Sequence, residues 1–187
     1  MLQGRGFFLA LCFIAVFMQS NAQVRCKIER FTTEDGLSHE RGTGIIKDSE
    51  GFIWMGSWDG INRFDGRNFI AYKSSPGDMV GLKNDRIDHF VEDKNNNFWL
   101  KGVDEFYKFD KSKETFESVS SLIPEIASND INVKKVFAFH GPEVWLQTRG
   151  RGIFMVPDSR SNKSIWLNQN NGRLVCGTTY FIYQDKN

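Results

Sequence analysis

The feature that most constrains the fold of this chain is an internal repeat of about 45 residues. Shifting the sequence by 45 positions against itself superposes eight identical pairs. These pairs are Gly36/Gly81, Leu37/Leu82, Arg41/Arg86, Asp48/Asp93, Trp54/Trp99, Asp59/Asp104, Phe64/Phe109 and Asp65/Asp110. A third, looser copy is centred on Trp145, which lies 46 residues after Trp99. A repeat of this length with a tryptophan and turn glycines is typical of a propeller or a solenoid.

The spacing of apolar residues within one copy decides between these two architectures. The apolar runs have the length of strands, and Asp, Ser, Gly and Asn separate them; in the first copy they are Gly44–Ile46, Phe52–Met55, Ile61–Phe64 and Phe69–Tyr72. A helical solenoid would need stretches of about ten residues with apolar spacings of three and four, and the repeat has none. The sequence therefore predicts an all-β chain, a partial β-propeller of about three to four four-stranded antiparallel blades.

The copies also predict where each blade begins and ends. We expect blades at approximately 38–75, 84–119 and 131–160, with a partial fourth blade over 161–187 that begins with Ile165–Leu167. Residues 28–35 show the pattern of an outer strand but precede the first blade, so they are predicted to be an orphan closing strand. A closed ring takes four to eight blades. We therefore expect the chain to be the front portion of a longer protein.

Five aromatic residues at repeated positions are predicted to fill the space between neighbouring sheets, because large aromatic side chains dominate core burial. They are Trp54, Phe64, Trp99, Phe109 and Trp145. In the second copy Asn95–Asn97 replaces Ser49–Gly51. Asn is the non-glycine residue that best tolerates a left-handed backbone, so the hairpin is expected to survive without its glycine.

The first 22 residues read as a removable export signal. Arg5 precedes an apolar run over residues 7–18, and small or polar residues follow up to Ala22. The alternative is a permanent anchor, but the run is shorter than the ~20 residues needed to span a bilayer. We therefore predict a signal peptide over 1–22 and a periplasmic location for 23–187. Whether Cys26 and Cys176 form a disulfide in that oxidising compartment stays open.

Charge and composition exclude several classes of partner. The chain has 24 Lys and Arg against 23 Asp and Glu, and the mature chain loses Arg5 with the signal, so its formal charge is zero. Nucleic acid is excluded as a partner because phosphate binding needs a basic surplus. Zinc-type Cys/His spacing and Asp-rich calcium loops are absent from the sequence, so no metal and no cofactor is expected.

The best-formed repeat carries a family likeness. It reads Gly36-Leu37, then residues 48–57 with Phe52-Ile53-Trp54-Met55-Gly56-Ser57, then Gly60-Ile61-Asn62-Arg63-Phe64-Asp65-Gly66. This resembles the two-component regulator propeller repeat, found in the periplasmic sensor part of hybrid two-component histidine kinases that govern polysaccharide use in gut bacteria. The likeness covers roughly residues 31–157. Lys101 stands where the first copy has Gly56, and Glu105 replaces Gly60, so the turn of the second copy is expected to differ.

The resemblance implies a signal receptor whose other parts lie outside this chain. Its implied partners are the missing C-terminal blades and the kinase portion of the full-length sensor, which is expected to dimerise. The three histidines His39, His89 and His140 are scattered, and no nucleotide-binding glycine motif is present in the sequence. The chain is therefore predicted not to be an enzyme.

In such a blade, the loop between the second and third strands opens on the same face as the connection between blades. Ligand-binding candidates on this face are Trp58, Asp59, Asn84, Asp85, Asp104, Arg149 and Arg151. Trp58 beside Asp59 offers an apolar stacking surface and a carboxylate for a sugar. Arg149 and Arg151 suit uronate or sulfate groups. The alternative is that these are merely solvated turn residues.

The predicted function is an extracytoplasmic ligand-sensing fragment that detects an oligosaccharide and is non-catalytic by itself. One alternative is a protein-binding or structural propeller scaffold. A second, less favoured alternative is a carbohydrate-active enzyme, which would need two carboxylates about 5 to 10 Å apart at the axis. Only Asp88 falls on the innermost strands, and one carboxylate is not a pair.

Overall fold

The structure is a computed structural model that describes residues 27–187, except 76–81, 104, 140, 158–163 and 186–187. The expected signal peptide lies outside the described residues, and so does Cys26, so the disulfide question stays open. The chain divides into two compact units, Met1–Arg30 and Phe31–Asn187. All the strands of the described residues lie in the second unit.

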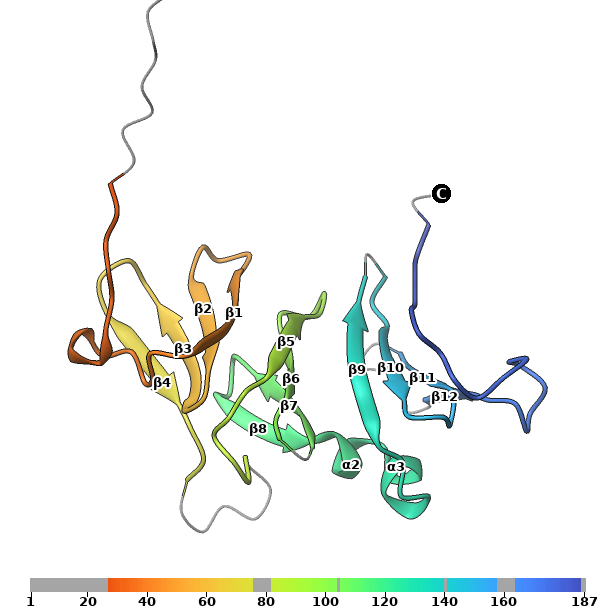
Figure 1. Ribbon diagram of the computed structural model, residues 1–187. Helices are drawn as coiled ribbons and strands as arrows, with labels where there is room; N and C mark the ends of the chain where they lie inside the picture. Colours follow the sequence, from red (N-terminus) through yellow and green to blue (C-terminus); the bar gives the residue numbers. More distant parts are fainter. Residues whose placement is uncertain (1–26, 76–81, 104, 140, 158–163, 186–187) are drawn as a thin grey trace, which may run out of the picture. The chain divides into compact units, whose positions relative to one another are not determined.

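Three four-stranded antiparallel sheets follow one another along the chain, and each is a simple meander (Figure 1). The first sheet consists of β1 (Gly42–Lys47), β2 (Ile53–Ser57), β3 (Gly60–Phe64) and β4 (Phe69–Tyr72). The second consists of β5 (His89–Glu92), β6 (Phe98–Lys101), β7 (Phe106–Asp110) and β8 (Thr115–Ser118). The third consists of β9 (Val133–Ala138), β10 (Val144–Thr148), β11 (Ile153–Val156) and β12 (Ile165–Leu167). The predicted all-β class is confirmed, as is the four-stranded antiparallel repeat.

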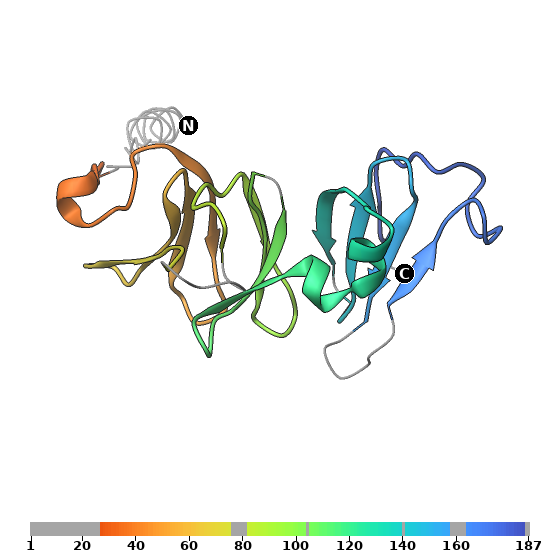
Figure 2. The same cartoon turned by 90° about the horizontal axis from the view of Figure 1, so that it is seen from below.

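The first strands of the three sheets are neighbours, since β1 contacts β5 and β5 contacts β9. Two short helices, α2 (Val119–Leu122) and α3 (Pro124–Ser128), lie in the connection from β8 to β9 (Figure 2). They bury Val119 and Ile126 in the core shared by the second and third sheets. The longer connection is thus part of that core.

Aromatic side chains fill the space between the first and second sheets. Trp54 is 1% exposed, and its ring centroid lies 4.8 Å from that of Phe98 and 5.8 Å from that of Phe109, both on the second sheet. On its own sheet it stacks on Tyr72 at 5.6 Å. Trp54 therefore joins one sheet to the next.

The other repeated aromatics do not all share this environment. Trp99 is buried against the third sheet, in a core with Val144 and Phe154. Trp145, at the same repeat position, is only half-buried. Phe64 is buried away from this core, stacked on Phe69 with ring centroids 4.6 Å apart.

A shared hydrogen-bonding pattern explains the first two tryptophans. The Asp48 carboxylate accepts the backbone N–H groups of Glu50 and Phe52 and, at 2.7 Å, the Nε1–H of Trp54. Asp93 does the same in the second repeat, where it accepts from Asn95, Asn97 and Trp99. We call this arrangement the Asp–Trp clamp, because one carboxylate closes the hairpin and fixes the ring.

The third repeat has no clamp, since Phe139 stands six residues before Trp145, where the other copies have Asp. Trp145 therefore lacks the carboxylate partner that Trp54 and Trp99 have. In the second repeat Asn96 has φ 61°, matching Gly51 with φ 94° in the first. The prediction that asparagine substitutes for the turn glycine is confirmed.

The prediction that a partial fourth blade over 161–187 begins with Ile165–Leu167 is wrong. Ile165–Leu167 is β12, which pairs antiparallel with β11 and completes the third sheet. The third sheet therefore extends past the expected boundary at 160. Residues 168–185 contain no strand. The sequence misled here because the loop before β12 is long, and the third copy lacks the Asp-Gly turn that marks the outer hairpin in the first.

The predicted closing strand over 28–35 is also corrected. Thr33–Asp35 forms a 3₁₀ helix, and residues 27–32 belong to no sheet. A reciprocal capping box sets this turn: Asp35 accepts the backbone N–H of Thr32 at 2.7 Å, and the Thr32 hydroxyl accepts the N–H of Glu34. Phe31 packs on Phe64 with ring centroids 4.9 Å apart. Within this unit the segment covers an aromatic pair of the first sheet.

The turn of the second sheet differs from the first, as the departures at Lys101 and Glu105 predicted. The first sheet turns through two residues, Trp58 and Asp59, between β2 and β3. The second turns through residues 102–105, closed by a hydrogen bond from the Gly102 N–H to the Glu105 carbonyl at 2.9 Å. Gly60 allows the tight turn because its φ is 99° and a Cβ there would lie 2.3 Å from the Tyr72 carbonyl oxygen.

Candidate functional site

The candidate site is built around the two-residue turn between β2 and β3. Ser57 ends β2; its hydroxyl donates to the Gly60 carbonyl and accepts the N–H of Asp59. The Gly60 N–H donates to the Asp85 carbonyl at 2.7 Å, and the Ile87 N–H donates to the Ser57 carbonyl at 2.8 Å. The segment that leads into the second sheet is thereby fixed against this turn.

The segment that leads into the first sheet is fixed at the same place. Ser38 donates its backbone N–H to the Asn62 side-chain oxygen at 2.9 Å, and its hydroxyl lies 2.9 Å from the Ser57 hydroxyl. Asn62 is fully buried and also donates to the Met55 carbonyl. Ser57 and Asn62 thus hold together the β2–β3 hairpin, the segment that leads into the first sheet and the segment that leads into the second.

Three basic or aromatic side chains from these stretches gather on Trp58, and we call the group the Trp58 cluster: His39, Arg41, Trp58 and Arg86. The guanidinium carbons of Arg41 and Arg86 lie 4.2 Å and 4.7 Å from the Trp58 ring centroid, and the His39 ring lies 6.1 Å away. Trp58 keeps 38% of its surface exposed. The cluster is an exposed cation–π arrangement.

The two arginines of the cluster differ in their ion pairs. Arg86 donates from Nε to Asp88 at 2.7 Å, and Lys101 lies 3.8 Å from the other oxygen of that carboxylate. In the described part of the chain, Arg41 has no carboxylate within ion-pair distance. Arg41 is therefore the guanidinium of this cluster that an anionic group can reach.

Of the residues predicted from the first two repeats, Trp58 is in the cluster and its neighbours serve the turn. Asp59 is ion-paired with Lys73 at 2.5 Å. Asn84 accepts the N–H of Arg86 with its side chain, and Asp85 accepts the N–H of Ser74. Asn84 thus positions Arg86, and Asp85 holds the chain that follows β4.

The remaining predicted residues fall elsewhere. Asp104 lies outside the described residues. Arg149 and Arg151 belong to the turn of the third sheet and are exposed. Arg149 borders a cavity of about 170 Å³ together with Lys101 and Lys134. The structure gives no contact between these arginines and Trp58.

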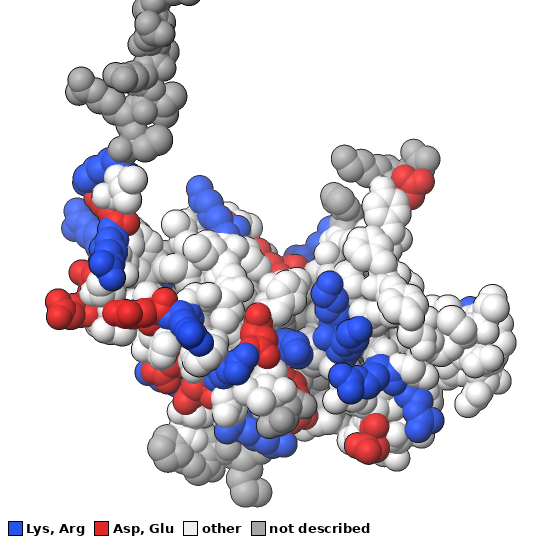
Figure 3. Space-filling view, in the orientation of Figure 1, with Lys and Arg blue, Asp and Glu red and all other residues white. Residues whose placement is uncertain are grey.

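Further positive charge lies between the first strands of the second and third sheets. Burial lowers the pKa of His89 on β5, and the charges of Lys135 on β9 and Lys101 on β6 lower it further. In the space-filling view, Lys and Arg side chains gather over β9 (Figure 3). A neutral His89 at pH 7 leaves the two lysines as the charges of this patch.

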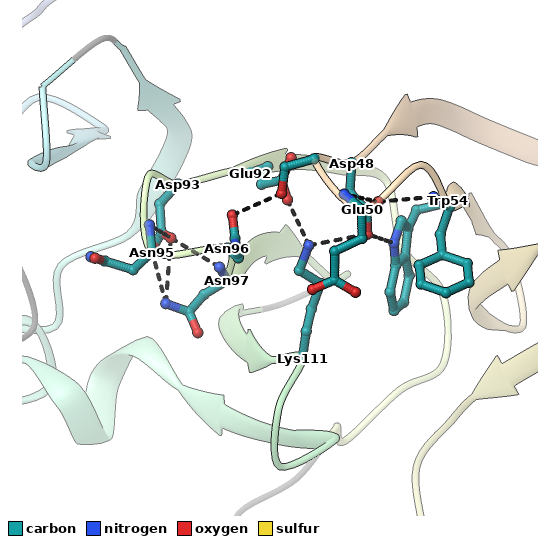
Figure 4. A network of polar contacts seen from close by, with 11 residues as sticks. Asp48, Glu50, Trp54, Glu92, Asp93, Asn95, Asn96, Asn97 and Lys111 are labelled. Atoms are coloured by element: carbon teal, nitrogen blue, oxygen red, sulfur yellow. Dashed lines mark hydrogen bonds and ion pairs between the residues drawn. The ribbon is translucent and has the colours of Figure 1, made fainter.

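A second polar network lies between the first two sheets and is structural (Figure 4). Lys111, 10% exposed in its side chain, lies 3.2 Å from the Asp48 carboxylate and 2.6 Å from that of Glu92. Its ammonium also lies 4.8 Å from the Phe98 ring centroid. Lys111 therefore neutralises the first Asp–Trp clamp from the neighbouring sheet.

The predicted site residues did not include six residues that carry these arrangements: His39, Arg41, Ser57, Asn62, Arg86 and Lys111. Arg41 and Asn62 lie inside the repeated or family-like motifs, so their positions were available as a signal. Lys111 had none, since nothing at its position repeats in the first copy, where Gly66 stands.

The described residues include no group of three or more His, Cys, Asp or Glu side chains placed to hold a metal ion. They also include no helix long and apolar enough to cross a membrane.

Comparisons with known proteins agree with the architecture. No family model matches the chain. A segment of 52 residues is 40% identical to histidine kinase P4 of Formosa agariphila, covering 28% of this chain and 4% of that protein. Among solved structures, the extracellular domain of BT3049 of B. thetaiotaomicron, described as a hybrid two-component system, matches with a TM-score of 0.58 and 22% identity over 76% of this chain.

That solved domain is much longer than the chain, which covers 20% of it. The extracellular domain of BT4673 from the same organism matches with a TM-score of 0.49 and 18% identity, over 73% of this chain and 19% of that one. The likeness to BT3049 shows a shared fold. The resemblance predicted from the repeat is confirmed: the chain shares its fold with the extracellular domain of BT3049, described as a hybrid two-component system, and its local sequence match is to a histidine kinase.

Proposed function

We propose that the chain is an exported, non-catalytic ligand-sensing segment of a two-component regulatory sensor, folded as an arc of a β-propeller. Three observations support the arc: the sheets are meanders of equal strand number, their first strands are neighbours, and a hydrophobic core fills the space between successive sheets. The fold shared with an extracellular domain supports the exported location.

The ligand we propose is a glycan fragment that carries an acidic group, and the Trp58 cluster carries the proposal. An indole ring offers an apolar face or edge to a sugar ring. A guanidinium stacked on an aromatic ring keeps its N–H donors in its own plane, where they fit a carboxylate or sulfate. Arg41 supplies such donors without a competing carboxylate among the described residues.

The carboxylates near this face favour binding over hydrolysis. The structure corrects the expectation that Asp88 is the acidic residue of an innermost strand: Asp88 precedes β5, and Glu92 lies on it. Asp88 is ion-paired with Arg86 and Lys101, Glu92 with Lys111, and Asp59 with Lys73. A glycosidase needs a free pair of carboxyl groups, one of which is protonated. We therefore expect the chain to bind and release the glycan without cleaving it.

A titration with defined sugars tests the proposal. We expect trigalacturonate or a sulfated disaccharide to bind the purified chain by isothermal titration calorimetry, and neutral maltotriose to bind at least about tenfold more weakly. Arg41→Ala and Trp58→Ala are each expected to weaken acidic-sugar binding by about tenfold or more, which is about 1.4 kcal/mol.

Arg67→Ala is the matched control, because Arg67 is an exposed turn arginine of the same sheet outside the cluster. Its affinity should equal that of the unaltered chain. Equal losses in the Arg67 and Arg41 variants would indicate unspecific charge attraction and contradict the proposed site. Equal binding of the neutral and acidic sugars would contradict the ligand class.

A further inference from the structure

The tail that follows β12 repeats the geometry of the connection between the first two sheets. The Gly60 N–H at the start of β3 donates to the carbonyl of Asp85, 25 residues later, at 2.7 Å. The Gly152 N–H, immediately before β11, donates to the carbonyl of Gly177, also 25 residues later, at 2.9 Å. Both glycines have positive φ, 99° and 89°. Gly177 thus occupies the place of Asp85.

A second contact, two residues further along, keeps the same register. The carbonyl of Ile87 accepts the Thr43 hydroxyl at 2.7 Å, and the carbonyl of Thr179 accepts the side-chain amide of Gln147. The first of these donors is on β1 and the second is on β10. In both cases a side chain of the preceding sheet holds the incoming chain.

The sequence follows this register although the tail shows no obvious repeat. The shift of 92 positions that places Gly177 on Asp85 also places Leu174 on Leu82. It places Asp185 on Asp93, the aspartate of the second Asp–Trp clamp. Residues 180–183 then correspond to residues 88–91, most of which form β5. Their composition, Tyr-Phe-Ile-Tyr, has high strand propensity and no charge.

These residues present apolar side chains that none of the three described sheets covers. Tyr180, Phe181 and Tyr183 are 85%, 68% and 74% exposed. In the second sheet the residue corresponding to Ile182 is Phe90, which is only 3% exposed because β6 and the first sheet enclose it. Phe181 already lies against β9, with its ring centroid 6.1 Å from that of Phe137.

We propose that residues 180–183 are the first strand of a fourth sheet, and that their free edge binds an antiparallel strand of the pattern Phe-Trp-Leu. The occupant follows from the second sheet, where β5 pairs with Phe98–Leu100 and Val91 lies opposite Trp99. In the same register Tyr183 lies opposite the tryptophan. The uncharged edge favours strand addition over an ionic partner.

A chimera tests this surface with a strand of known pairing. Residues 96–118 of the same chain are appended after Asn187, so that Asp185-Lys186-Asn187 is followed by the hairpin that follows Asp93-Lys94-Asn95. We expect amide hydrogen exchange at residues 181–183 to slow by at least about tenfold relative to the parent chain. The same appended residues in scrambled order should give no protection.

Gly177→Ala in the chimera separates docking of the tail from unspecific collapse. A Cβ at Gly177 would lie 2.5 Å from the Gly150 carbonyl oxygen, so the variant should abolish the protection, while Thr178→Ala, at an exposed residue, should retain it. Exchange in β9–β11 reports that the third sheet still folds in each variant.

Unchanged exchange at 181–183 in a folded chimera would overturn the proposal. So would concentration-dependent protection of these residues in the parent chain, which would indicate pairing between two copies instead. These exchange measurements do not depend on whether the chain binds a sugar, so they test this proposal separately from the proposed ligand.

Discussion

Trp54→Ala is expected to lower the free energy of unfolding by about 3–5 kcal/mol, the largest loss of any single substitution considered. Trp54 is 1% exposed and contacts aromatic rings of both the first and the second sheet, so its removal leaves a cavity between them. The substitution also removes a hydrogen-bond donor from the buried Asp48 carboxylate. Chemical denaturation followed by circular dichroism measures the loss.

Trp145→Ala is the matched control for this experiment, since it removes the same side chain from the same repeat position. Because Trp145 is half-buried and its repeat lacks the clamp aspartate, we expect a loss of about 1–2 kcal/mol. Trp54→Phe, which keeps a ring but no N–H donor, should fall between the two. Equal losses at Trp54 and Trp145 would show that the clamp and the inter-sheet contacts add nothing to burial of the ring.

The sequence predicted what local chemistry determines. Strand-length apolar runs and turn residues specified three meanders, and the left-handed backbone of Asn96 followed from the tolerance of asparagine for that conformation. These predictions held because each depends on residues close together in the chain. The repeat then extended them from one sheet to the next.

The two wrong strand predictions, for residues 165–167 and 28–35, concern segments whose pairing partner is distant in sequence or absent from the described residues. Residues 165–167 have the same apolar pattern whether they end one sheet or begin another, and only their pairing with β11 decides. Phe31 was assigned to a strand by its pattern, yet a capping box formed by Thr32 and Asp35 ends the segment in a 3₁₀ turn. Side-chain capping outweighed strand propensity there.

The candidate site shows the same division. Trp58 was identified because it is an aromatic residue in a predicted turn. Arg41 was not, because its position over the indole depends on Ser38, Ser57 and Asn62 joining two segments that are separated in sequence. A pattern within one repeat cannot reveal a contact that two strands, β2 and β3, and two connections create together.

Lys111→Met is expected to lower the free energy of unfolding by about 2–3 kcal/mol at pH 7, the second-largest effect. Met keeps the apolar contact with the Phe98 ring but removes the cation that lies between Asp48 and Glu92. Asp48 is buried, so its carboxylate loses a charged partner that water cannot replace. Lys113→Met is the control, because that side chain is 75% exposed and its loss should change stability by no more than about 0.5 kcal/mol.

The cost of Lys111→Met should also depend on pH, in a direction that the Asp48 carboxyl sets. Burial alone would raise the pKa of Asp48, but hydrogen bonds from Trp54 and Lys111, together with the Lys111 charge, hold it below its ordinary value of 3.8. A carboxyl whose pKa is lowered by folding stabilises the folded state above its unfolded pKa and loses that contribution as the pH falls through the folded value. The difference between the unaltered chain and Lys111→Met should therefore be full at pH 7 and shrink below about pH 4, where protonated Asp48 no longer needs a cation. Denaturation midpoints measured at both pH values check this, and a difference that stays constant or grows on acidification would show that Lys111 acts through packing rather than through its charge.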